Sequence, residues 1–353
     1  MNRPHWALVG TRTTAERQAQ GRGLTLYQTA AFERPWTPTC TLVLTNPSYQ
    51  VINRAQTRAY TVHGDMSDLS VIGLRPDGSM AVLQNTSTGG MNPVHLCLTH
   101  DEKFLLICNY ASGNLVCLPV RGDGLLDEPT SVLTFRGTPG PRHQDQKGSH
   151  PHQVVQWPGS RWFLVPDKGL DQLHTVRLNT AGQLEQVCAH TAPAGSGPRH
   201  LAANVREGTL WLCLELESAV ARLQFDPGSG RVRAKTPGTV LISTLPDGHI
   251  GNNSAAGIAL HPSGQRLYVS NRGHDSVCTI AVNHTGDGAA PRTWTSTLGR
   301  TPRFIALTPE ANALIVANEG THEVVQFGLD HQGLPTAGIV VAHPGSPVCV
   351  SMV

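Results

Sequence analysis

The sequence predicts an all-β fold, a seven-bladed β-propeller, and two observations support this prediction. A segment of short apolar runs separated by turn-forming residues recurs along the 353 residues, with a spacing mostly in the forties. Such a spacing, with four short strands in each repeat, is typical of propeller blades. Solenoids of helix pairs share this spacing, but no apolar pattern with a 3.6-residue period runs long enough here to favour them.

The repeat at residues 197–226 shows how the strands are predicted. It opens with residues 198–200, an alternating run follows them, and a turn is predicted at residues 207–208. A continuous apolar run at residues 210–214 and a third run at residues 219–225 complete the segment. Short runs rich in Val, Leu and aromatic residues, broken by turn formers, are typical of antiparallel strands joined by hairpins.

Variants of this repeat open at seven places in the chain. Successive openings are 46, 58, 47, 57, 47 and 45 residues apart, and only residues 348–353 follow the last one. We therefore predict seven blades. The second residues of the openings are Pro47, Pro93, Pro151, Pro198, Ala255, Pro302 and Pro347.

The two ends of the chain are predicted to build the last blade together. Three strand-like runs, at residues 6–9, 24–29 and 41–44, precede the first repeat, and one run at residues 348–353 follows the last opening. Pairing of the C-terminal strand with the three N-terminal strands would remove the unpaired edges of an open ring. The length alone allows two domains, but an unbroken repeat favours one domain over residues 1–353.

Composition excludes several other classes of protein. Charged residues make up 15% of the chain, which holds 36 Gly and 25 Pro, and this suits a turn-rich β protein. The formal net charge of +2, without runs of like charge, leads us to expect no nucleic-acid and no membrane partner. No apolar stretch could span a bilayer, and the N-terminus lacks the apolar core of a secretory signal. The eight cysteines form no C-x-x-C pair, which favours buried free thiols and a cytoplasmic location.

Strand geometry predicts where functional residues gather. The first two strands of each repeat form an antiparallel hairpin, so the first strand begins at the same end of the blade at which the second strand ends. The first strand of a blade lines the central channel of a propeller, so these positions meet around one mouth of the channel. The two longest connections, residues 136–149 and 246–254, precede a first strand and border the same mouth, where loops often carry function.

The predicted mouth carries cations, carboxylates and imidazoles, whereas the opposite ends of the strands carry ordinary turn residues, as at residues 75–78 and 262–265. This asymmetry is the main functional signal from the residues alone. We expect Asp167-Lys168, Glu217 and His274 to form a solvated rim. The mouth positions are Arg12, His95, Asn109, Tyr110, His150, His152, Asp167, Lys168, Arg199, His200, Glu215, Glu217, Asn271, Arg272, His274, Arg303, Asn318 and Glu319.

Four segments of the repeats carry a family resemblance. They read HPHQVVQWPGSRWFLVPDKGLDQLHTVRL, GPRHLAANVREGTLWLCLELESAVARLQFD, GQRLYVSNRGHDSVCTIAV and TPRFIALTPEANALIVANEGTHEVVQFGLD. With these segments the chain resembles, over nearly its whole length, the seven-bladed propeller lactonases. That family includes the propeller-type 6-phosphogluconolactonases and the fungal 3-carboxy-cis,cis-muconate lactonizing enzyme.

The resemblance implies lactone chemistry and a set of site residues. The family's proposed site has a His before the first strand of the third blade, the Arg of Pro-Arg-His, the Glu that closes the next strand and the Arg of Ser-Asn-Arg-Gly. By motif these fall on His152, Arg199, Glu215 and Arg272. Family members often have Asn-Glu where this chain has Leu214-Glu215. The further substrate-binding residues that we expect at the mouth are Arg303, Asn109, Asn318 and Glu319.

Lactone hydrolysis needs a base for water, positive groups near the developing oxyanion, and a proton for the leaving alkoxide. His152 suits the role of base, because imidazole titrates near neutral pH. Glu215 could orient His152, act as the base itself in apolar surroundings, or neutralise the arginines in a buried network. Arg199 and Arg272 could hold an oxyanion or clamp a carboxylate or phosphate.

Three classes of function fit these residues. The first is a metal-independent lactonase acting on a sugar-derived or carboxylated lactone, and the second is a lactonizing cycloisomerase acting on an unsaturated diacid. The third, a propeller that binds a partner protein, is disfavoured because Gly-His…Trp-Asp repeats are missing. We expect no cofactor and no metal, since no Cys lies near His143, His150 and His152 and their spacing is not that of zinc ligands. The expected partner is a small-molecule lactone, and no signal for an oligomeric state stands out.

Overall fold

The computed structural model describes residues 5–29, 34–234, 241–282 and 292–352. In these residues the regular structure is strand, apart from one 3-10 helix, η1 (Ala15–Arg17). The strands form seven sheets, each with four strands in a simple order and one with a fifth strand at its edge. This confirms the predicted all-β fold and the count of seven blades. No helix in the described residues is long and apolar enough to cross a membrane.

The chain divides into two compact units, which are described separately. Unit 1 consists of residues 1–59, 72–82 and 244–353, and unit 2 of residues 60–71 and 83–243. One sheet has strands with residues in both units, and a single domain for the whole chain stays a prediction. The strands of that sheet are β4 (Pro47–Ile52), β5 (Arg58–His63), β6 (Asp68–Leu74) and β7 (Met80–Ser87).

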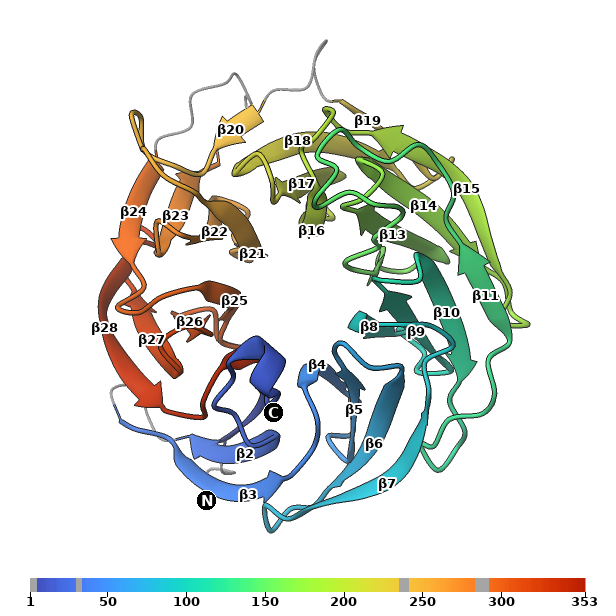
Figure 1. The fold of residues 1–353 in the computed structure, drawn as a ribbon, viewed down its shortest axis with the longest axis horizontal. Coiled ribbons are helices and arrows are strands. Elements are labelled where there is room, and N and C mark those ends of the chain that lie inside the picture. The colour runs from blue at the N-terminus through green and yellow to red at the C-terminus, as the bar shows by residue number, and fades with distance from the viewer. Residues whose placement is uncertain (1–4, 30–33, 235–240, 283–291, 353) are drawn as a thin grey trace. The chain divides into compact units, whose positions relative to one another are not determined.

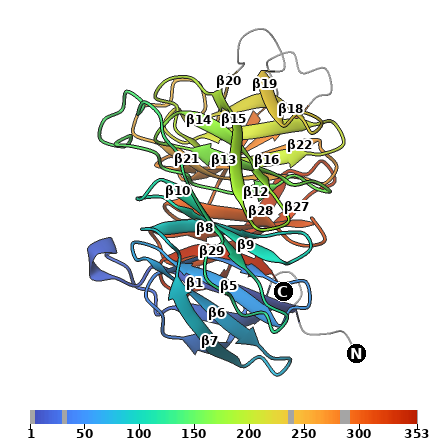
Figure 2. The ribbon, with the colours of Figure 1, turned by 90° about the vertical axis from the view of Figure 1, so that its right-hand side faces the viewer.

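Unit 2 holds three complete sheets in chain order. In Figure 1 the first strands β8 and β16 lie on the inner side of this unit and the last strands β11 and β15 on its outer side. Figure 2 shows the outer strand β15 beside β14, its neighbour in the sheet of order β12-β13-β14-β15. The strands are β8 (Pro93–Leu98), β9 (Phe104–Asn109), β10 (Asn114–Pro119), β11 (Ser131–Thr134), β12 (Val155–Gln156), β13 (Trp162–Asp167), β14 (Gln172–Leu178), β15 (Leu184–Thr191), β16 (Pro198–Asn204), β17 (Thr209–Leu214), β18 (Ala219–Asp226), β19 (Arg231–Ala234) and β20 (Leu241–Ser243).

The second strand of the middle sheet of unit 2, β13, is apolar on both faces because another sheet of the unit covers each face. Along β13, Phe163 and Val165 belong to one core cluster with Leu106 of the preceding sheet. Leu164, which points the other way, packs in a second cluster with Leu212 of the following sheet. The outer strand β15 alternates between exposed and half-buried side chains. This stacking fixes the ends of β9, β13 and β17 relative to one another.

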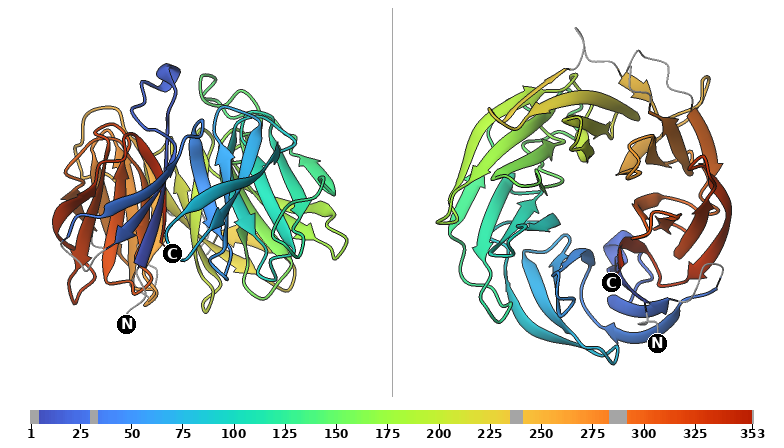
Figure 3. Two further views of the ribbon diagram at one scale, coloured as in Figure 1. Left: turned by 90° about the horizontal axis from the view of Figure 1, so that it is seen from below. Right: turned by 180° about the vertical axis from the view of Figure 1, so that it is seen from behind.

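Unit 1 holds the other three complete sheets, two from the chain after residue 253 and one from both ends of the chain. Figure 3 shows the loop that carries η1, between β1 and β2, projecting beyond the strands of its sheet. The strands are β1 (His5–Thr11), β2 (Leu24–Thr29), β3 (Thr37–Leu42), β21 (Ser254–Leu260), β22 (Arg266–Arg272), β23 (Ser276–Ala281), β24 (Arg292–Ser296), β25 (Pro302–Leu307), β26 (Ala313–Asn318), β27 (Glu323–Leu329), β28 (Pro335–Ala342) and β29 (Pro347–Met352).

The sheet built from both termini has the predicted composition. Its order is β29-β1-β2-β3, and β29 is antiparallel to β1 with Val350 opposite Val9. The third N-terminal strand was predicted at residues 41–44 but lies at Thr37–Leu42. Its position follows from pairing, because Leu42 lies opposite Leu24, the first residue of β2, and Val43 beyond it is 88% exposed.

Candidate functional site

A β-bulge at the start of β16 turns Arg199 out of the strand ladder. Pro198 lies opposite Leu214 and His200 opposite Cys213, which leaves Arg199 as the extra residue. Bulges of this kind redirect a side chain. Glu215 follows directly after β17, and its Oε2 lies 2.9 Å from Arg199 Nε in an ion pair whose side chains are 3% and 9% exposed.

Glu215 also holds a second buried cation, Lys168. Lys168 Nζ lies 2.8 Å from Glu215 Oε1, and the lysine side chain is 8% exposed. Burial by itself would lower the pKa of Lys168, but the charge of Glu215 outweighs it and the pKa lies above its ordinary value. Lys168 therefore stays an ammonium, and its predicted place in a solvated rim is wrong. The prediction is wrong for Asp167 too, which is fully buried.

Asp167 fixes the turn that presents Lys168. Its carboxylate accepts hydrogen bonds from Ser149 Oγ at 2.5 Å and from the backbone N–H of His150 at 2.8 Å. His174 Nε2 lies 3.2 Å away on the next strand. Burial favours the neutral acid, but the hydrogen bonds from His174, Ser149 and His150 keep the pKa of Asp167 below its ordinary value. Asp167 is thus an ionised structural anchor.

Three imidazoles lie beside this network. The ring centroids of His152 and His200 are 5.2 Å apart, and those of His95 and His200 are 5.7 Å apart. Burial, and then the Arg199 charge, lower the pKa of His95 to about 3 and that of His200 well below its ordinary value. The backbone N–H of Val154 donates to His95 Nδ1 at 3.4 Å, so neutral His95 carries its proton on Nε2. His95 and His200 are therefore uncharged at neutral pH.

Acid should destabilise the protein through these buried imidazoles. The folded pKa of His95, about 3, is lower than the ordinary value of 6.5, so its contribution to stability is complete above pH 6.5 and is lost as the pH falls toward 3. We expect His95→Gln to reduce the acid loss of unfolding free energy by about 1.4 kcal/mol for each pH unit in that window. Denaturant unfolding between pH 7 and 4 measures this, with exposed His331→Gln as the control. Equal pH slopes in the two variants would contradict the assignment.

Tyr110 links the imidazoles to the charged network. Its ring stacks on His150 at 4.3 Å and meets His152 edge-on at 5.6 Å, and its hydroxyl accepts a hydrogen bond from Lys168. Tyr110, Lys168 and Glu215 each follow the second strand of their sheet, so the same repeat position supplies all three. That shared position is the sequence signal that identifies Lys168 as a site residue.

The charged residues that are predicted to bind substrate lie in unit 1. Arg303 is the extra residue of a bulge in β25, and its Nη1 is 3.7 Å from Oε2 of Glu319, which follows β26. This repeats the Arg199–Glu215 arrangement with greater exposure, 22% and 20% for the two side chains. Arg272 ends β22, and its Nη2 donates to the carbonyl of Ala255 at 3.3 Å.

Asn109 and Asn318, for which contact with substrate stays a prediction, form hydrogen bonds between neighbouring sheets. Both side chains are fully buried. Asn109 Nδ2 donates to the carbonyl of Thr88 at 3.0 Å, and Asn318 Nδ2 donates to that of Thr297 at 2.9 Å. Each threonine follows the last strand of the preceding sheet, so these amides tie one sheet to the next.

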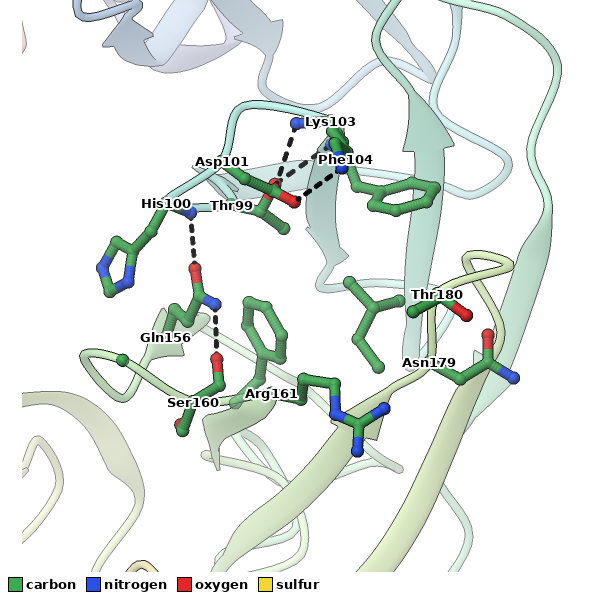
Figure 4. A pocket seen from close by; sticks show the side chains of 13 residues that line it. Thr99, His100, Asp101, Lys103, Phe104, Gln156, Ser160, Arg161, Asn179 and Thr180 are labelled. Atoms are coloured by element: carbon green, nitrogen blue, oxygen red, sulfur yellow. Dashed lines mark hydrogen bonds and ion pairs between the residues drawn. The ribbon is translucent and has the colours of Figure 1, made fainter.

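A cavity of about 280 Å³ lies at the other end of the unit 2 sheets (Figure 4). It is lined by hairpin turns, in which Thr99 Oγ1 donates to Asp101 Oδ1 at 2.7 Å and the backbone N–H of His100 donates to Gln156 Oε1 at 2.7 Å. None of the candidate residues lines it. Ordinary turn chemistry is what the sequence predicts at this end. Over the residues that the structure describes, no group of His, Cys, Asp and Glu side chains could hold a metal ion.

Comparison with known proteins agrees with this arrangement of sheets. A family model described as a lactonase, 7-bladed beta-propeller, matches residues 6–352. A 6-phosphogluconolactonase of Bacillus subtilis is 30% identical over 315 residues, which is 87% of each chain. The structure of the periplasmic gluconolactonase of Pseudomonas aeruginosa is similar with a TM-score of 0.88 and 26% identity, over 99% of both chains. Because the match runs almost from end to end and the sheets number seven, the chain belongs to the family of seven-bladed β-propeller lactonases.

Proposed function

We propose that this lactonase hydrolyses a sugar-derived lactone without a metal ion, at the cluster of His152, Lys168, Arg199 and Glu215. The observation that carries the proposal is that Glu215 lies between two buried cations, at 2.8 Å from Lys168 and 2.9 Å from Arg199. Glu215 is shared by both cations and so does not fully neutralise Arg199, and His95 and His200 beside it are uncharged. Such a site favours an oxyanion at a reacting carbonyl.

These contacts suggest a catalytic role for each residue of the cluster. The two cations stabilise the ionised form of Glu215 and make it a poor proton acceptor, which leaves His152 as the base. His152 takes a proton from water while the water oxygen attacks the lactone carbonyl carbon. The carbonyl oxygen becomes negative and is stabilised by Arg199, whose guanidinium is held by Glu215. The ring C–O bond then breaks, and the alkoxide takes up a proton to give a hydroxy acid.

The relatives support an aldonolactone as the substrate. One is named a 6-phosphogluconolactonase and another a gluconolactonase, and neither is a cycloisomerase. The cycloisomerase alternative is therefore not favoured. The binding of an anionic group of the substrate by Arg272 and Arg303 stays a prediction from the sequence, and we further propose that the enzyme acts in the cytoplasm.

The test is proton release by the purified protein on a panel of substrates. We expect turnover of glucono-δ-lactone or its 6-phosphate above the spontaneous rate, and none with muconates. The same assay after exhaustive EDTA treatment should give an unchanged rate. Turnover of muconates alone would replace the proposal with the cycloisomerase, and loss of activity in EDTA with rescue by calcium or zinc would overturn the metal-independent mechanism.

A further inference from the structure

Tyr110 and Lys168 lie in the candidate site with no part in the reaction described so far. Opening a lactone ring releases an alkoxide, which is a poor leaving group unless it is protonated as the C–O bond breaks. Resting on the proposed lactonase function, we propose that Tyr110 is the proton donor to the leaving ring oxygen and that Lys168 positions it and stabilises its phenolate.

The contacts of Lys168 exclude it as the direct donor. An ammonium has three N–H groups, and Lys168 has three acceptors: Glu215 Oε1 at 2.8 Å, Asp145 Oδ1 at 3.4 Å and the Tyr110 hydroxyl. No N–H group is left for a substrate. Lys168 therefore acts through Tyr110.

The hydroxyl of Tyr110 is suitably placed and protonated. Because it accepts a hydrogen bond from Lys168, its own proton points away from the lysine. Burial raises the pKa of Tyr110 above its ordinary value, and the Lys168 charge only partly offsets this, so the phenol keeps its proton at neutral pH. Stacking on His150 and edge contact with His152 hold the ring beside the base.

The proton balance closes within the site. When the tetrahedral intermediate collapses, the ring C–O electron pair moves to the ring oxygen, which takes the Tyr110 proton. The phenolate that remains faces the Lys168 ammonium. It recovers a proton from the imidazolium of His152, which took one from the attacking water. Water and lactone are consumed, one hydroxy acid is formed, and both side chains return to their starting forms.

Tyr110→Phe tests the proposal, since it keeps the stacked ring and removes only the hydroxyl. The variant and the parent are assayed on an aldono-δ-lactone and on the same lactone with sulfur in place of the ring oxygen. A thiol ionises at about pH 8.5, so a thiolate leaves without a proton donor. We expect kcat on the oxygen lactone to fall by roughly 100-fold or more, and kcat on the thiolactone to stay within about threefold of the parent.

The matched control is Tyr60→Phe, which removes a hydroxyl that donates to the carbonyl of Gly124 in the same unit. It should leave both rates unchanged. Equal losses on the two lactones for Tyr110→Phe would overturn the proposal and reduce Tyr110 to a packing role. A parent that hydrolyses no lactone above the spontaneous rate would instead overturn the proposed function, and the two failures are therefore distinct.

Discussion

Replacing Arg199 with alanine is expected to lower kcat by roughly 100-fold or more, the scale of losing a preorganised oxyanion donor. Arg199 is the bulge residue of β16, and its guanidinium is 3% exposed and fixed by Glu215. A cation held in place before the reaction stabilises charge that appears only in the transition state, so the loss falls on kcat. Arg177→Ala is the control, because Arg177 is an exposed arginine paired with Glu185 in the same unit.

The split between kcat and KM identifies the role of each arginine. If Arg199 only anchored the substrate, KM would rise while kcat held, and that outcome would contradict its proposed role. We expect this second pattern for Arg272, which is half-buried and donates to a backbone carbonyl. Steady-state kinetics on one lactone with both variants separates the two cases.

Deleting residues 348–353 should abolish cooperative folding. The deletion removes nearly all of β29, in which Val348, Cys349 and Val350 are each less than 5% exposed. Each such side chain contributes about 1.5 kcal/mol or more by burial, and the loss also leaves one edge of β1 unpaired. Several kcal/mol is a large part of the stability of a typical protein.

Thermal unfolding followed by circular dichroism measures the effect of this deletion. Ser351→Ala is the control, since it removes one hydrogen bond to the carbonyl of Gln50 and should cost about 1 kcal/mol with the single transition kept. An unchanged midpoint in the truncated chain would show that β29 does not close the sheet.

The fold was largely predictable because a proline marks the start of the first strand in most of the repeats. Strands β4, β8, β16, β25 and β29 begin at the predicted prolines, since Pro is tolerated at the first residue of a strand. The third repeat departs from this pattern. Pro151 forms an isolated β-bridge with Asp167. The first strand of this sheet consists only of Val155–Gln156. Irregular backbone at residues 151–154 is the local feature that carries His152.

The site was less predictable because its chemistry depends on distant pairs. Lys168 looks like a surface residue in its own segment, and it is buried because Glu215 comes to 2.8 Å from it. Asn109 and Asn318 fit the predicted position, but local sequence does not reveal the threonine carbonyls that bind them. The bulge that redirects Arg199 likewise depends on pairing between β16 and β17.

The pH dependence of kcat for the parent and His152→Asn tests the proposed chemistry most directly. A base works only when deprotonated, so the parent rate should rise with pH through the neutral range. The variant should fold normally but lose this rise and most of its turnover, while His143→Asn, on an exposed part of the preceding loop, should behave as the parent. Near-parent turnover in His152→Asn, on a lactone that the parent hydrolyses well, would rule out His152 and leave Glu215 as the base.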